Sequence, residues 1–227
     1  MHLRLGEHNF FGHWMYGFKS IFVIDPLYTL PFLVFLILTL FQKRTSKKRR
    51  IYNLAGLTLS TSYLVFTLLA KGIAYTRIES ALKLQAIDYK HIDIRPYPLN
   101  TILWSANIET DDSYLLGSYS FFDTQDISFD THPKNHDLLG DLKENEKVQR
   151  MIAISEGWYT IQKANNHLYY NDLRFGLLNL KPQSEDFVFK YLIEEDPDGT
   201  VRFIEQEKTP RDGMQLMSDL WQRVKGN

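Results

Sequence analysis

Two long apolar stretches, neither with the alternation expected of strands, dominate the first third of the chain. The first covers residues 26–41 and follows apolar residues 21–24, and the second covers residues 52–74. A membrane-spanning helix needs about 20 consecutive, mostly apolar residues. The alternative is a pair of buried helices in a water-soluble protein, but residues 30–41 contain no charged side chain. We therefore predict two transmembrane helices that form a hairpin over residues 21–75.

A strongly basic segment, residues 43–50, separates the two apolar stretches. Six of its eight residues are Lys or Arg. Such a run is also typical of nucleic-acid binding, but between two apolar helices it predicts a short cytoplasmic loop. Both outer ends of the hairpin, and everything after residue 75, are then expected on the extracytoplasmic side. Residues 1–20 are rich in aromatic side chains and are expected to form an interfacial segment.

After residue 92 the pattern changes to the period of two that is typical of half-buried strands. Alternation recurs over residues 102–109, 115–122, 158–163, 167–171, 187–193 and 201–205. Turn-forming residues separate neighbouring strands at 110–113, 164–166 and 196–199. Helical spacing predicts helices over residues 138–154 and 211–225, the second with a stripe that is either core or a docking surface. The expectation for residues 76–227 is a soluble α+β domain with a largely antiparallel sheet.

The charge distribution supports this division of the chain. Residues 1–90 hold 12 Lys and Arg against four Asp and Glu, whereas residues 91–227 hold 14 against 23. The net charge of the whole chain is -1, which argues against general nucleic-acid binding. The chain has no cysteine, which excludes disulfides, a thiolate nucleophile and Cys-ligated metal sites.

Two ionisable residues lie within the predicted membrane hairpin, near its extracytoplasmic end. Folding the hairpin about residue 47 places Asp25 and Lys71 within about 3 Å of the same depth, because an α-helix rises 1.5 Å per residue. Charges at membrane depth are usually paired, so we expect these two to face each other or a shared polar cavity. The alternative is that Lys71 extends to the headgroups while Asp25 caps the first helix ahead of Pro26. A polar stripe on the second helix comprises Asn53, Gly56, Ser60, Thr67 and Lys71.

The remaining candidate chemistry lies after residue 120. Asp172 and Arg174 share one face of a predicted strand, where the Arg could grip a carboxylate or phosphate, although an in-sheet ion pair that fixes register is the favoured interpretation. Asp126, Asp130 and Asp137 lie near His132 and His136 in the stretch 123–141. The stretch matches no metal-binding pattern and is expected to form a solvated acidic loop that leads into a helix. The usual nucleotide, hydrolase-elbow and zinc-protease motifs are absent.

Three stretches carry a family resemblance. Residues 20–31 (SIFVIDPLYTLP), 56–63 (GLTLSTSY) and 96–104 (PYPLNTILW), with the basic segment, resemble the bacterial membrane-bound metal-dependent hydrolases associated with the LexA regulon. Residues 105–123 and 170–176 are also similar. The resemblance implies a divalent metal, held in that family by His-rich motifs on membrane helices that precede this region. No stretch here matches those motifs, so the chain resembles the C-terminal portion of such a protein.

Two hypotheses follow. The first is a membrane-bound hydrolase, or its C-terminal part, with Asp25, Lys71, Asp172 and Arg174 as candidate catalytic residues and with no residue of this chain assigned to a metal or a cofactor. The second is a non-catalytic, membrane-anchored sheet domain that binds a protein partner or an envelope component. Both predict a multi-pass protein of the bacterial inner membrane. The expected partners are the lipid bilayer and either further membrane helices or a second copy, and no nucleic acid.

Overall fold

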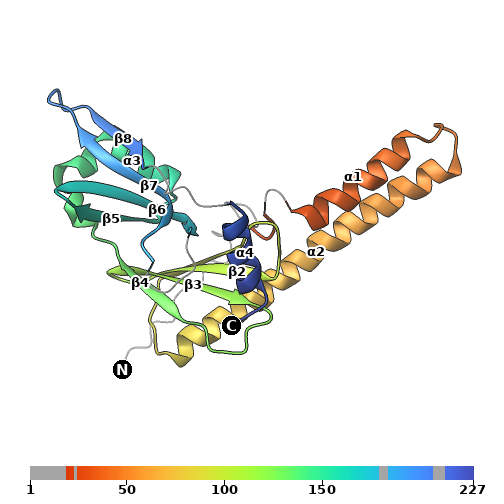
Figure 1. Ribbon diagram of the computed structural model, residues 1–227, viewed down its shortest axis with the longest axis horizontal. Coiled ribbons are helices and arrows are strands. Elements are labelled where there is room, and N and C mark those ends of the chain that lie inside the picture. Colours follow the sequence, from red (N-terminus) through yellow and green to blue (C-terminus); the bar gives the residue numbers. More distant parts are fainter. Residues whose placement is uncertain (1–18, 23–24, 179–183, 207–212) are drawn as a thin grey trace. The chain divides into compact units, whose positions relative to one another are not determined.

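The chain divides into two compact units (Figure 1). The computed structural model describes residues 19–22, 25–178, 184–206 and 213–227. Most of the predicted interfacial segment 1–20 therefore lies outside the described residues. One unit holds residues 1–76 and 95–102, and the other holds residues 77–94 and 103–227.

The first unit is built from a short helix and most of a long one. Helix α1, Pro26–Leu40, begins where it does because Asp25 caps it: the carboxylate accepts a hydrogen bond from the amide of Leu27 at 2.9 Å, and Pro26 occupies the first helical turn. Its 15 residues reach only about 22 Å, short of the 30 Å or so of a bilayer core.

Helix α2, Lys47–Leu84, is the one helix among the described residues that is long and apolar enough to cross a membrane. The predicted hairpin of two transmembrane helices is therefore wrong, because the cap at Asp25 prevents α1 from gaining the extra turn that it needs. The basic segment is also only partly a loop. Its residues 47–50 form the first turn of α2, and the helix continues nine residues beyond the predicted end of the membrane hairpin at residue 75.

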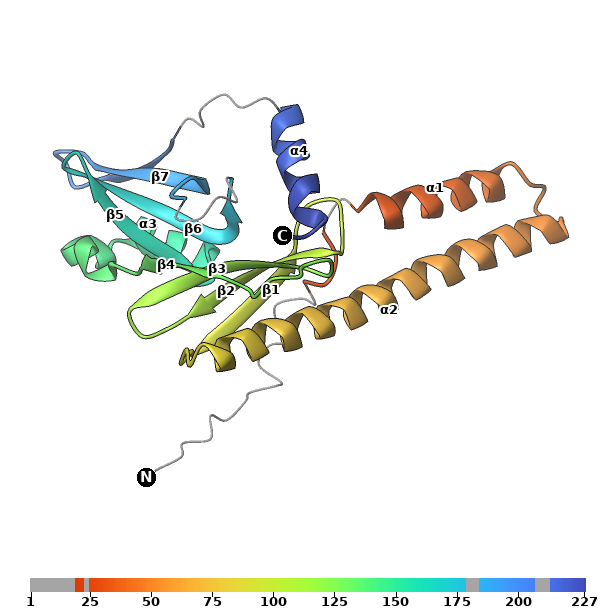
Figure 2. The ribbon, with the colours of Figure 1, turned by 60° about the horizontal axis from the view of Figure 1, so that its bottom comes forward.

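The second unit contains two four-stranded sheets rather than the single sheet that we expected. The first has the order β1-β2-β3-β4 and the second β5-β6-β7-β8, so both are simple meanders (Figure 2). The first sheet consists of β1 His91–Pro96, β2 Leu103–Glu109, β3 Ser113–Ser120 and β4 Phe129–Pro133. The second consists of β5 Tyr159–Ala164, β6 His167–Leu177, β7 Phe187–Glu195 and β8 Val201–Glu205.

The predicted hairpins are confirmed, and all of their strand pairs are antiparallel. Trp104 of β2 pairs with Tyr119 of β3, and β5 and β6 join through Asn165 and Asn166, both with positive φ. Gly199 (φ 80°) closes the turn between β7 and β8. Strands β1 and β4 were not predicted. The stretch 123–141, expected as a solvated loop leading into a helix, contains β4 and the start of a 3₁₀ segment.

Each sheet carries one of the predicted helical regions. The first is divided at Asn145, whose extended backbone ends the 3₁₀ segment η2, His136–Glu144, and whose side chain caps helix α3, Glu146–Ile154. A non-helical Gly140 also kinks η2 itself. Leu139 and Val148 from these pieces pack into the core of the second sheet with Tyr159, Ile161 and Tyr170. Helix α4, Gly213–Val224, instead returns to the first sheet, where the Oγ of Ser120 donates to the carbonyl of Val224.

Candidate functional site

The three stretches that carry the family resemblance meet at one polar cluster in the helical unit. Tyr63 of α2 donates a hydrogen bond to Asp25 at 2.8 Å, and the hydroxyl of Thr101 lies 3.4 Å from the Tyr63 hydroxyl. Because the Tyr63 proton points to Asp25, Thr101 is the donor to Tyr63. Asp25 is 1 % exposed, and Tyr63 and the capped amide of Leu27 bind its two oxygens. We call this arrangement the Asp25–Tyr63–Thr101 cluster.

Local sequence explains how Thr101 reaches the cluster. Asn100 accepts a hydrogen bond from the amide of Ile102 and donates to the carbonyl of Pro98, each at 3.0 Å. These two bonds close a tight turn that presents Thr101. The periodicity of the sequence does not indicate the contact between Thr101 and Tyr63. The turn itself is indicated by the spacing of Pro98, Asn100 and Thr101.

Asp25 is paired with Tyr63 rather than with Lys71, and the reason is geometric. The predicted pairing of Asp25 with Lys71 assumed that the hairpin folds about residue 47. In the structure α1 ends at Leu40 and α2 begins only at Lys47. Asp25 lies 15 positions before the end of α1. It is therefore level with the residue about 16 positions after the start of α2, which is Tyr63. Lys71 lies two turns further along, about 12 Å away. The alternative role of Asp25, as the cap of α1, is confirmed.

Small and hydroxylated residues of the predicted polar stripe do face inward. Gly56, Ser60 and Thr67 are buried, whereas Asn53 at the start of the stripe is exposed. The Ser60 hydroxyl donates to the carbonyl of Gly56 and that of Thr67 to the carbonyl of Leu64, both at 2.8 Å, so neither needs water.

The two helices approach each other closely at Gly56. A Cβ atom at this position would lie 2.8 Å from the Cβ of Phe35 on α1. No larger residue fits without moving a helix.

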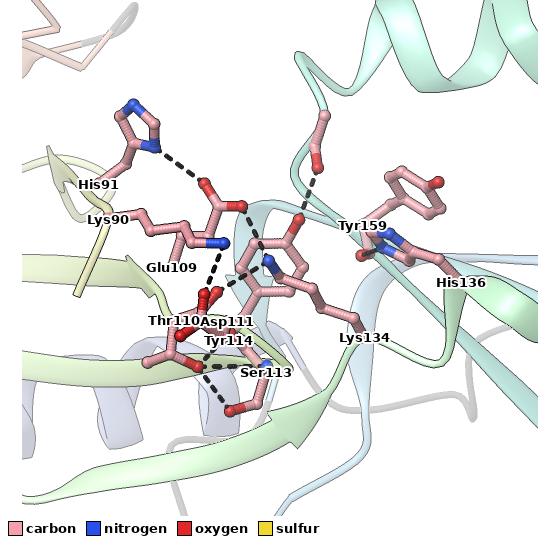
Figure 3. A network of polar contacts seen from close by, with 11 residues as sticks. Lys90, His91, Glu109, Thr110, Asp111, Ser113, Tyr114, Lys134, His136 and Tyr159 are labelled. Carbon is pink, nitrogen blue, oxygen red and sulfur yellow. Dashed lines mark hydrogen bonds and ion pairs between the residues drawn. The ribbon is translucent and has the colours of Figure 1, made fainter. Parts of the chain in front are cut away.

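A second cluster ties together the two sheets of the other unit (Figure 3). Lys134, directly after β4, donates from its ammonium group to Glu109 and to the carbonyl of Thr110, each at 2.8 Å. Its backbone amide donates to Asp112 in the β2–β3 turn, and its carbonyl accepts from Ile161 of β5. One residue thus holds the edge of the first sheet against the edge of the second.

The polar side chains around Lys134 bind one another. Glu109 receives Lys134 on one oxygen and His91, at 2.9 Å, on the other. Burial favours the neutral acid, but the hydrogen bonds from Lys134 and His91 outweigh it and hold the pKa of Glu109 below its ordinary value. His136 stacks on Tyr159 with ring centres 4.0 Å apart and contacts the Tyr159 carbonyl. Both carboxylate oxygens of Glu109 are thus bound, and we interpret the cluster as a structural junction.

Asp172 and Arg174, the candidate pair on β6, also bind each other. Arg174 binds Asp172 through two nitrogens, with the shortest contact at 2.6 Å, and Asp172 is buried. The interpretation as an in-sheet ion pair fits this geometry, since the fork of the guanidinium is occupied. Of the four candidate catalytic residues, Asp25 and Lys71 lie in the helical unit, and Asp172 and Arg174 lie in the sheet unit.

The described residues do not fit the metal that the resemblance implies. Across the described ranges, no three His, Asp or Glu side chains come together as a group that could hold an ion. The two histidines of the stretch 123–141 separate, since His132 packs edge-on against Phe187 while His136 stacks on Tyr159.

Comparisons with known proteins leave the family open. No family model, no curated protein and no solved structure matches the chain.

Proposed function

We propose that this chain is a membrane-anchored protein, held in the bilayer by α2, whose two-sheet unit is a non-catalytic binding domain. The observation that carries the proposal is the apolar surface of the two helices. Helix α1 has no buried residue, and Leu57, Val65 and Leu69 of α2 are all more than half exposed. Monomeric proteins in water rarely leave a contiguous apolar surface of this extent uncovered.

The length of the uncharged part of α2 supports insertion. Residues 51–70 contain no charged side chain and lie between Arg50 and Lys71. At 1.5 Å per residue they extend about 30 Å, the thickness of a bilayer core. The hydroxyls of Ser60 and Thr67 within this stretch bond to carbonyls of their own helix, which lowers their cost in a bilayer. Helix α1 is too short to span and lies against α2 at Gly56.

The basic segment sets the proposed orientation. Positive charge next to a span favours the cytoplasmic side. A single crossing by α2 then places its other end, and the sheet unit that follows, on the extracytoplasmic side of the bacterial inner membrane. A non-catalytic role for that unit is supported by its ion pairs, because Glu109, Asp172 and Asp123 are each bound by an internal basic partner.

Membrane fractionation of the full chain tests the anchor. The double variant Leu57→Asp, Leu64→Asp puts two charges on one face of the proposed span, at about 3 kcal/mol each. It should move the protein from the carbonate-resistant membrane fraction to the soluble or aggregated fraction. Ile204→Asp, on an apolar side chain of β8 that is 41 % exposed, is the matched control and should change nothing. Wild-type protein that leaves the membrane on a carbonate wash would refute the proposal.

A second candidate is the C-terminal part of a metal-dependent hydrolase. It is favoured by the meeting of three resembling stretches at the Asp25–Tyr63–Thr101 cluster. In that case Asp25 would belong to a site whose metal ligands come from another segment. Thermal unfolding in detergent with EDTA, Zn²⁺ or Mn²⁺ separates the two candidates. A metal-dependent rise in Tm that disappears in Asp25→Asn favours the hydrolase, and a Tm indifferent to metal favours the binding domain.

A further inference from the structure

The basic segment, residues 43–50, forms the turn between α1 and α2 and the first turn of α2 (Figure 1). Its six cations are Lys43, Arg44, Lys47, Lys48, Arg49 and Arg50. We propose that this segment is a binding site for the phosphate headgroups of anionic phospholipids. The inference rests on the proposed membrane anchor and deepens it by naming the lipid class.

No acid near the segment neutralises it. Among the described residues of the helical unit, Asp25 is the only Asp or Glu, and it lies at the opposite end of α1, bound to Tyr63. None of the ion pairs found in the described ranges involves the six cations. An external anion is therefore the available source of neutralisation.

The dipole of helix α2 also favours an anion at its N-terminus. The N-terminus of an α-helix carries a partial positive charge, which acidic residues in the first turn usually offset. Helix α2 has none there and instead begins with Lys47, Lys48, Arg49 and Arg50. Four cations at the positive end of a helix repel both one another and the helix dipole, and a layer of phosphates relieves both repulsions.

An apolar collar directly beneath the charges determines the kind of anion. Phe41 at the end of α1 is 82 % exposed, and Leu40, Ile51 and Leu54 are each at least 60 % exposed. With this collar in hydrocarbon, the ammonium and guanidinium groups lie at headgroup depth, where clusters of four to eight cations select anionic lipids. A soluble phosphate would satisfy the charges but would leave the collar in water, so we assign the site to a lipid.

Fluorescence of a dye attached at position 45 of the full chain in detergent tests the assignment. The chain has no cysteine, so Thr45→Cys gives a single labelling site. The probes are micelles doped with phosphatidylglycerol, the same micelles doped with phosphatidylcholine, and inorganic phosphate. We expect saturable binding of phosphatidylglycerol at least about tenfold tighter than of phosphatidylcholine, since each cation near an anionic surface is worth roughly fivefold. The binding should weaken as salt is added.

A pair of charge-matched variants locates the effect. Replacing Lys43, Arg44, Lys47 and Lys48 by Gln should abolish the preference for phosphatidylglycerol. The control replaces four exposed cations of the sheet unit, Lys143, Arg150, Lys163 and Lys225, by Gln and should retain it, although its net charge is the same. Circular dichroism checks that both variants keep their helix content.

Three results would overturn the inference. Equal binding of the two lipids would remove the headgroup preference and leave the membrane anchor standing. Binding of inorganic phosphate as tight as that of phosphatidylglycerol would mean a phosphate site and not a lipid site. Equal loss in both variants would mean that net charge, and not the basic segment, is responsible. Loss of the anchor itself would be seen separately, as wild-type protein that leaves the membrane on a carbonate wash.

Discussion

Replacing Arg223 by methionine should release the C-terminal helix α4 from the first sheet. Arg223 binds the two carboxylate oxygens of Asp123, at 2.5 and 2.8 Å, and donates to the hydroxyl and the carbonyl of Ser118 at 3.1 and 3.0 Å. The Asp123 side chain is 3 % exposed and that of Arg223 17 %. Methionine preserves the aliphatic packing of the stem and removes all four bonds.

The magnitude follows from what the substitution leaves behind. Breaking a buried ion pair from one side costs about 3–5 kcal/mol, because the remaining charge stays desolvated. Asp123 keeps one bond, from the amide of Ser120 at 2.9 Å, so we expect the lower end of that range. At 1.4 kcal/mol per factor of ten, a loss of about 3 kcal/mol raises the opening equilibrium of α4 by roughly 100-fold.

Hydrogen exchange of the full chain in detergent measures this opening. Amides of residues 217–224 should exchange roughly 100-fold faster in Arg223→Met, while those of β6 stay unchanged. Arg150→Met, on the exposed face of α3, is the control for loss of a surface cation. A double-mutant cycle with Asp123→Asn should give a coupling energy above 1 kcal/mol. A coupling near zero would show that the two contacts between Arg223 and Asp123 contribute nothing to holding α4, and the reasoning from burial would be refuted.

Further predictions concern the helical unit and acid sensitivity. Gly56→Leu should separate α1 from α2 and lower the Tm in detergent, whereas Gly72→Leu, with no atom within 4 Å of the added Cβ, should not; equal effects would contradict the close approach. Tyr63→Phe should cost about 1–3 kcal/mol in thermal unfolding, because it leaves a buried oxygen of Asp25 unpaired, and an unchanged Tm would show that the cluster is not intact. Burial lowers the pKa of His132 below its usual value of 6.5, so the folded state resists a proton that the unfolded state accepts. The stability contributed by the neutral ring is complete above pH 6.5 and declines as the pH falls below it, and the gap in Tm between wild type and His132→Leu should change over that range; a gap independent of pH would contradict this sign.

The strands were predictable where two local signals agreed. Alternating side chains over residues 102–109 and 115–122, with polar turn residues between them, predict the observed β2–β3 pair because a hairpin needs only neighbouring residues to pair. The short strands β1 and β4 were not predicted. Each is recognised only by its hydrogen bonds to the adjacent strand of the sheet, which is β2 for β1 and β3 for β4. Similarly, the spacing over residues 138–154 correctly predicts a helical region, but the kink at Gly140 was not predicted.

The length of α1 shows how one polar residue can override an apolar run. The pattern of apolar residues from 21 to 41 is long enough for a span, and hydropathy alone does not place the helix start. Asp25 and Pro26 do place it, because a carboxylate that binds the amide of Leu27 ends the helix on its N-terminal side. The same cap sets the depth of Asp25 and so decides that its partner is Tyr63.

By itself, the sequence determined the local features of this protein: the apolar α2 with its 20 uncharged residues, the basic segment, the hairpin turns, and the cap of α1. These depend on neighbours within a few positions, where side-chain chemistry and backbone preference act directly. Only the tertiary structure decided that there are two sheets, that Lys134 joins them, that α4 returns to the first sheet through Arg223, and that Thr101 reaches Tyr63. Each of these contacts joins residues far apart in the chain. Its free energy depends on the burial and satisfaction of polar groups, which no periodicity along the sequence records.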